Sequence, residues 1–147
     1  MKSYMKLTFI MAPFYPKLDD KSRNQFLSIA QNTSLTQDQL GEELVKWGKK
    51  LPQDLQKEVV KVGIKLLISL IQLQSQINHY KFSKEAQTYG NRLKAISNNT
   101  NITIIESEKR ISDVINSASP KIQQELAKFE FWMEREFDNI VLNIGNN

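Results

Sequence analysis

The second half of this 147-residue chain repeats the first at a distance of 67 residues, and this duplication restricts the possible folds more than any other feature. The matched pairs share core, capping and polar roles: Phe26 with Leu93, Ile29 with Ile96, Thr36 with Thr103, Leu44 with Ile111, and Glu58 with Glu125. Because the same core, capping and polar roles recur in the same order, we predict that the chain contains one structural unit twice. Two such units can bury each other's apolar faces, as repeated units generally do.

Each unit has the pattern of three helices. Apolar residues at helical spacing predict the first three helices at about residues 19–31, 36–51 and 52–80. Thr36 is predicted to cap the second of these, with Gln39 as its capping-box partner. Pro52 suits the first turn of the third, where a missing N–H costs nothing.

The second unit is predicted to follow the same plan, with a fourth helix from Ser83 to the Asn-rich stretch 98–101, a fifth that begins at Thr103, and a sixth from Pro120 to about residue 144. Ser83 is the expected cap of the fourth helix. Thr103 is the expected cap of the fifth, with Glu106 as its box partner. Pro120 should begin the sixth, which follows a one-residue shift in the repeat.

The third helix carries two apolar stripes. One consists of Val59, Val62, Leu66, Leu70, Leu73 and Ile77, and the other of Val60, Ile64, Leu67 and Ile71. A helix that is apolar around most of its circumference is normally buried. This helix is therefore predicted to be buried on most sides and to form the centre of the fold.

The predicted fold class is all-α, a compact six-helix bundle of two pseudo-repeated three-helix units with a long central third helix. The length favours one domain, at residues 19–147, with repeat halves at about 19–80 and 83–144. Only five Gly and four Pro are present, which favours long helices, and the absence of Cys rules out disulfides.

Residues 1–18 are predicted to form a short apolar leader or an N-terminal arm. Lys2 and Lys6 precede the apolar run 7–12, as in an export signal, but this run is short for that role. An apolar arm packed on the domain is the alternative. The apolar run 66–73 is interrupted by Ser69 and Gln72 and is shorter than the roughly 20 residues of a transmembrane helix, so no membrane span is predicted.

Two segments of the chain resemble the nematode SXP/RAL family of secreted antigens. They are FLSIAQNTSLTQDQLGEELVKWGKKLPQDLQKEV at 26–59 and FSKEAQTYGNRLKAISNNTNITIIESEKRISDVINSASPKIQQELAKFE at 82–130. The shared features are a short helix, an Asn/Ser/Thr turn, a capped helix and a closing S-x-P-x-x-x-x-E-L element. Here that element runs from Ser117 to Leu126, with one extra residue before Pro120.

The resemblance implies a small, secreted, all-helical protein that is a host antigen or allergen and has no established catalytic residues. Its expected partners are host antibodies or other host proteins, and its oligomeric state stays open. The resemblance also implies paired helix-loop-helix units that are EF-hand-like in outline. However, the turns NTSLT and NTNIT lack the acidic ligand series that Ca²⁺ requires, so no metal or other cofactor is predicted.

Catalytic groups are scarce in this sequence. His79 is the only histidine, which excludes a two-histidine metal site, and the glycines match no phosphate-binding loop. Glu130 and Glu134 lie one helical turn apart on a face predicted to be exposed, where pKa tuning is weak. The chain is therefore predicted not to be an enzyme.

The basic residues also suit a binding surface. Six lysines can form a ridge for phosphate or lipid headgroups: Lys46, Lys49, Lys50, Lys57, Lys61 and Lys65. The net charge is only +4, with lysines generally scattered among acids, and no exposed aromatic residues interleave with the ridge. These features argue against a nucleic-acid partner.

Two functions remain. The first is a secreted binding or host-interaction protein without enzyme activity. The alternative is a carrier of a fatty acid or similar lipid between helices. The predicted apolar wall of that carrier site consists of Leu66, Leu70, Leu73, Phe129, Trp132, Met133 and Phe137. Three N-x-S/T sequons, at Asn32, Asn98 and Asn101, mark predicted glycosylation sites in the two equivalent turns.

Overall fold

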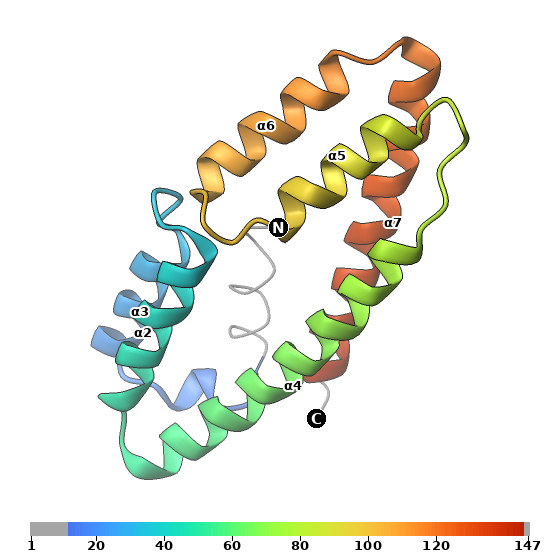
Figure 1. Ribbon diagram of the computed structural model, residues 1–147. Coiled ribbons are helices and arrows are strands. Elements are labelled where there is room, and N and C mark those ends of the chain that lie inside the picture. The colour runs from blue at the N-terminus through green and yellow to red at the C-terminus, as the bar shows by residue number, and fades with distance from the viewer. Residues whose placement is uncertain (1–11, 146–147) are drawn as a thin grey trace.

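The computed structural model describes residues 12–145, and within this range the fold is all-α, as predicted (Figure 1). Six α-helices follow a short 3₁₀ helix, and no strand is present among the described residues. The elements are η1 (Tyr15–Lys17), α2 (Asp20–Ala30), α3 (Gln37–Lys49), α4 (Gln53–His79), α5 (Gln87–Asn98), α6 (Ile104–Asn116) and α7 (Pro120–Gly145).

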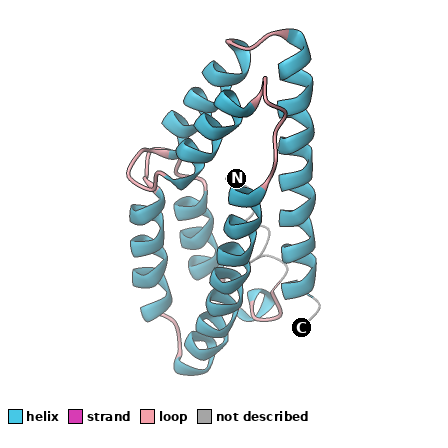
Figure 2. Cartoon of the chain, turned by 45° about the vertical axis from the view of Figure 1, so that its right-hand side comes forward, coloured by secondary structure: helices cyan, strands magenta, loops and turns pink. Residues whose placement is uncertain are grey.

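The helices pack in pairs that follow the repeat. α2 packs on α3, α5 packs on α6, and the two long helices α4 and α7 pack on each other. Figure 1 shows the α2–α3 pair on the left, the α5–α6 pair at the top and α7 on the right, with α4 running from the lower left toward α7. Figure 2 shows the same arrangement from another side. The third helix of each unit therefore joins the two units.

Helix caps agree closely with the sequence pattern. The Asp19 carboxylate accepts the Ser22 N–H at 2.7 Å at the start of α2. Thr36 and Gln39 form the predicted capping box, with bonds of 3.1 Å and 3.0 Å between side chain and backbone in both directions. Thr103 caps α6 as predicted. The Glu106 side chain was expected to complete a capping box by bonding back to the Thr103 backbone, and this prediction is wrong, because its carboxylate accepts a hydrogen bond from Arg110 at 2.6 Å.

The start of the fourth predicted helix also needs correction. Ser83 was expected to cap it, yet α5 begins only at Gln87. Ser83 instead holds a turn, since its Oγ accepts the Ala86 N–H at 3.2 Å. The Ser83 N–H and hydroxyl donate to the Glu125 carboxylate of α7 at 2.8 Å and 2.7 Å. This long-range anchor ties the segment before α5 to α7.

The equivalent turns of the two units lie against each other. Thr36 and Thr103 form an isolated antiparallel bridge. The Ile104 N–H donates to the Leu35 carbonyl at 3.1 Å, and the Thr100 hydroxyl donates to Asp38 at 3.1 Å. Backbone bonds between the two Asn/Ser/Thr turns therefore tie the two units together.

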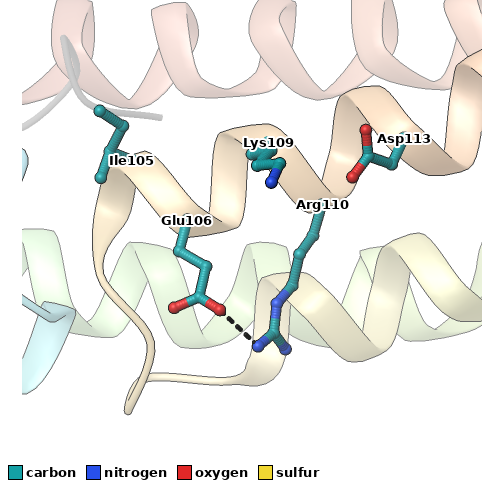
Figure 3. Close-up of a pocket in the computed structure, with 5 residues that line it drawn as sticks. All are labelled: Ile105, Glu106, Lys109, Arg110 and Asp113. Carbon is teal, nitrogen blue, oxygen red and sulfur yellow. Dashed lines mark hydrogen bonds and ion pairs between the residues drawn. The ribbon is translucent and has the colours of Figure 1, made fainter.

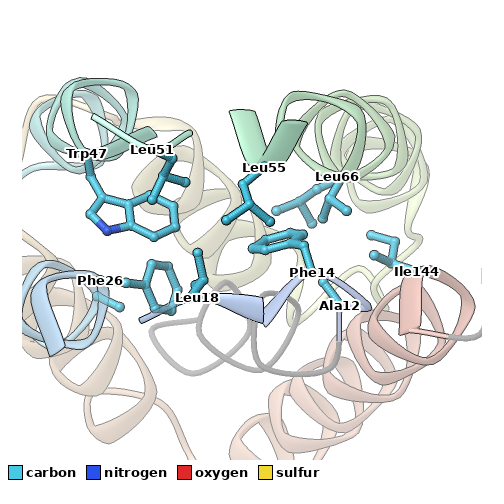
Figure 4. Close-up of a cluster of buried hydrophobic side chains, with 11 residues drawn as sticks. Ala12, Phe14, Leu18, Phe26, Trp47, Leu51, Leu55, Leu66 and Ile144 are labelled. Atoms are coloured by element: carbon cyan, nitrogen blue, oxygen red, sulfur yellow. The ribbon is translucent and has the colours of Figure 1, made fainter. Parts of the chain in front are cut away.

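The core consists of two clusters, each centred on one unit. The first, drawn in Figure 4, contains Ala12, Phe14, Leu18, Phe26, Ala30, Trp47, Leu51, Leu55, Val62, Leu66 and Ile144. The second contains Leu73, Ile77, Leu93, Val114, Ala118, Leu126, Phe129 and Phe137. Leu70 of α4 and Ile140 of α7 pack against both clusters. These two helices therefore run through both halves of the core.

Residues 12–18 form part of the first cluster. Ala12, Phe14 and Leu18 are buried there, and Figure 4 shows Phe14 beside Leu55 and Leu66. The described part of the predicted leader or arm is thus packed on the domain. Residues 1–11, on which the export signal was predicted, lie outside the described residues.

Candidate binding surface

The side of α4 that faces away from the core carries a row of exposed aliphatic side chains. The row consists of Val60, Ile64, Leu67, Ile68 and Ile71, which are 52% to 61% exposed. The stripe 60, 64, 67 and 71 was predicted to be buried, and this prediction is wrong. The long helix that packs on α4 is α7. The core side of α4 is occupied by the buried residues Val62, Leu66 and Leu73, so the opposite side is left without a neighbouring helix within residues 12–145.

The row is continuous along the helix. Its residues are spaced by four, three, one and three positions, which places them on one face of an α-helix. Residues 60 to 71 extend over roughly 17 Å at 1.5 Å per residue. Single exposed apolar residues are common on protein surfaces, whereas contiguous apolar patches mark interaction sites. We therefore take this outer row of α4 as the candidate functional site.

The repeat provides an internal comparison for this row. At a shift of 67 residues, its positions correspond to Ala127, Phe131, Glu134, Arg135 and Asp138 of α7. These five residues are also exposed. Three of these places therefore tolerate two acids and an arginine, so the fold does not require aliphatic residues at Leu67, Ile68 and Ile71.

Three lysines accompany the row along one edge. Lys57, Lys61 and Lys65 follow one another at intervals of four residues, and each precedes a row residue by three positions. After Glu58, α4 has no further Asp or Glu up to its end at His79. The edge of the outer row is therefore positively charged.

A hollow of about 230 Å³ lies beside this basic edge. Its lining comes from α4, from the segment at η1 and from the end of α7: Pro13, Phe14, Lys17, Glu58, Lys61, Val62, Lys65 and Ile144. Lys17 forms an ion pair with Glu58 at 2.8 Å. Among the described residues, no carboxylate forms an ion pair with Lys61 or Lys65. An anionic group could therefore approach these two side chains.

The predicted wall of the lipid carrier is part of the packed core. Leu73, Phe129 and Phe137 are buried in the second cluster, and Trp132 and Met133 pack against it. Leu66 belongs to the first cluster, and Leu70 contacts both. Phe129 and Trp132 stack with ring centroids 6.0 Å apart. The hollow at Lys61 and Lys65 contains none of these wall residues, and the carrier function stays a prediction.

The three sequons lie at the paired turns. Asn32, Asn98 and Asn101 are all exposed. The Asn32 side chain accepts the Ser34 N–H at 3.1 Å. Thr100 and Thr103, the sequon threonines of the second turn, are partly buried and bonded to Asp38 and Glu106. Glycosylation at the asparagines stays a prediction.

A second, shallow hollow of about 430 Å³ lies on α6 (Figure 3). Its lining consists of Ile105, Glu106, Lys109, Arg110 and Asp113, all from one helix. Glu106 and Arg110 pair at 2.6 Å and so neutralise each other. Side chains of one helix with mixed charge do not converge on a reacting atom in the way that a catalytic site requires.

Among residues 12–145, three carboxyl groups have displaced pKa values, and each displacement has a structural cause. The Ser22 hydrogen bonds lower the pKa of Asp19, and the Ser83 hydrogen bonds lower the pKa of Glu125. Burial, followed by the nearby Glu134 charge, raises the pKa of Glu130. The face of Glu130 was predicted to be exposed, but Glu130 is partly buried, which corrects that prediction.

The remaining chemistry-bearing groups in the described part of the chain do not form a cluster. His79 is exposed, with Nδ1 2.7 Å from the Ser75 carbonyl of the preceding turn. Over residues 12–145, no group of three His, Asp or Glu side chains is placed to hold a metal ion. None of the described helices combines the length and apolar character that crossing a membrane needs.

Comparisons of the chain with models of protein families, with curated proteins and with solved structures found no match. The resemblance to the SXP/RAL family therefore stays a prediction from the two segments quoted above.

Proposed function

We propose that this chain is a secreted, non-enzymatic helical binding protein of the SXP/RAL kind, and that it binds its partner through the outer row of α4. The observation that carries this proposal is the row itself. It exposes five aliphatic side chains at positions where the other unit has Ala127, Phe131, Glu134, Arg135 and Asp138. Aliphatic surface that the fold does not need favours a role in contact with another molecule.

The arrangement of the helix supports binding without rearrangement of the core. Val62, Leu66 and Leu73 face inward, and Ile64, Leu67 and Ile71 face outward from the same helix. Because the two sets point in opposite directions, a partner can cover the outer set while the inner set stays packed.

Site-specific photo-crosslinking tests this proposal. A photoreactive amino acid at Leu67 should capture a partner from host extracellular fluid or from host cells. The matched control carries the same group at Glu134, the equivalent exposed position of α7. Capture at Leu67 and little at Glu134 is expected. Equal capture at both positions, or none at Leu67, would refute the assignment of the binding surface.

Localisation tests the secreted part of the proposal. An antibody against the chain should find it in the secreted fluid or on the body surface of the organism that makes it. Exclusive recovery from the cytosol would contradict the proposal. This measurement does not depend on which partner is bound.

A further inference from the structure

We infer that the partner of the outer row of α4 is the surface of an anionic lipid bilayer, on which α4 lies in the plane of the headgroups. This inference rests on the proposed function and names the partner class for the same surface. It follows from three features of the row: its aliphatic composition, its basic edge and the absence of acids along it.

The composition of the row favours lipid over a protein partner. Its five residues are Val, Ile or Leu, with no Trp, Tyr or Arg among them. Those three residue types dominate the energetics of protein–protein interfaces. Aliphatic side chains beside lysines are instead the pattern of helices that lie at a membrane interface, with the apolar face about 5–10 Å deep.

The charges around the row favour an anionic surface. Lys57, Lys61 and Lys65 lie along one edge, each next to a row residue, so the ammonium groups can reach headgroup phosphates while the aliphatic side chains insert. The hollow that contains Lys61 and Lys65 offers space beside the helix for a phosphate or carboxylate group. Each lysine near an anionic membrane strengthens binding about fivefold.

The same charges disfavour a second copy of this chain as the partner. A symmetric antiparallel contact between two outer rows would bring the three lysines of both copies to one seam. Glu58, the nearest acid on α4, is already paired with Lys17. Like charges along a shared seam weaken such a contact, so self-association through this surface is not expected.

Vesicle flotation with the full-length chain tests the inference. The chain should float with vesicles of equal parts phosphatidylcholine and phosphatidylserine, and much less with vesicles of phosphatidylcholine alone. Binding should weaken as the salt concentration rises, because salt screens exposed charges. No binding to the mixed vesicles, or equal binding to both kinds, would overturn the inference.

Paired substitutions separate the two contributions. Ile64→Gln with Leu67→Gln should reduce binding to the mixed vesicles about tenfold or more, through lost apolar insertion. Lys61→Gln with Lys65→Gln should reduce it about 25-fold. The matched control is Ile105→Gln with Lys109→Gln on α6, which removes the same residue types from exposed positions and should leave binding unchanged. Binding that survives both test pairs would overturn the inference.

A single dye label locates the contact directly. The chain has no cysteine, so Leu67→Cys and Ile105→Cys each provide one site for an environment-sensitive dye. Mixed vesicles should shift the emission to the blue at position 67 and leave it unchanged at 105; the opposite pattern would count against the inference. Crosslinking of Leu67 to a host protein without any vesicle binding would refute the lipid partner while leaving the proposed function intact.

Discussion

Gly90 of α5 provides the sharpest test of the packing, because its missing side chain leaves room for the Phe82 ring. A Cβ atom built at Gly90 would lie 2.7 Å from Phe82 Cγ, with two further ring carbons still closer. The ring cannot move away freely, since it packs on Tyr80 and Phe129 with centroid distances of 5.0 Å to each. Gly90→Ala should therefore destabilise the fold.

The size of the stability change in Gly90→Ala follows from opposing effects. Alanine in place of glycine inside a helix gains about 1 kcal/mol. Overpacking costs about 1–3 kcal/mol, and disturbing the aromatic contacts of Phe82 costs about 1 kcal/mol more. The net expectation is a loss of about 1–3 kcal/mol in the free energy of unfolding.

Gly41 and Gly63 serve as matched controls. Both are inside helices, and a Cβ atom at either position meets nothing within 4 Å. Gly41→Ala and Gly63→Ala should therefore stabilise the protein by about 0.5–1 kcal/mol each. Urea unfolding followed by far-ultraviolet circular dichroism measures all three variants, and Phe82→Leu should relieve much of the Gly90→Ala penalty. A Gly90→Ala variant as stable as Gly63→Ala would refute the close approach of Phe82.

Three further predictions concern the anchor, the carrier function and the sequons. Ser83→Ala should raise the pKa of Glu125 and lower stability at neutral pH. The folded state holds this pKa below its ordinary value of 4.5, so the bond stabilises the fold only while Glu125 is ionised. The difference in unfolding free energy between the variant and the parent chain, measured in urea, should therefore shrink as the pH falls below that value. A difference that stays constant with pH would argue against the stabilising role of this bond. If the carrier function is correct, native mass spectrometry after delipidation and lipid exposure should show a bound fatty acid, and Trp132→Ala should reduce its occupancy; a chain that takes up nothing contradicts a carrier. Secretion from a eukaryotic cell should give glycan mass at Asn32, Asn98 or Asn101, and three unmodified asparagines would disprove those sites.

Helical spacing and capping residues were sufficient to predict most of the fold. Thr36 with Gln39 marked the start of α3, and Pro120 marked the start of α7, because these signals act within one or two turns. The prediction that Ser83 caps a helix failed because Ser83 bonds to a residue that is distant in the sequence. Its partner, Glu125, is 42 residues away, and a local pattern contains no information about such a bond.

The exposure of the outer row was also missed, for a related reason. Periodicity shows how many apolar faces a helix has, but not how many neighbours cover them. The repeat contained a usable signal, since Leu67, Ile68 and Ile71 correspond to Glu134, Arg135 and Asp138. A position that tolerates charge in one unit is a candidate for exposure in the other. That comparison, made along the whole helix, would have identified the row from sequence.

The two faces of α4 should therefore respond separately to substitution. Leu66 and Leu73 are buried, and truncating either to alanine should cost about 2–5 kcal/mol of stability. Replacing Leu67, Ile68 and Ile71 by the Glu, Arg and Asp of the equivalent α7 positions should leave unfolding nearly unchanged, since the second unit already folds with those residues. The same triple replacement should abolish binding through the row. If it unfolded the protein instead, the exposed aliphatic residues would be part of the fold, and the reason to assign them a partner would disappear.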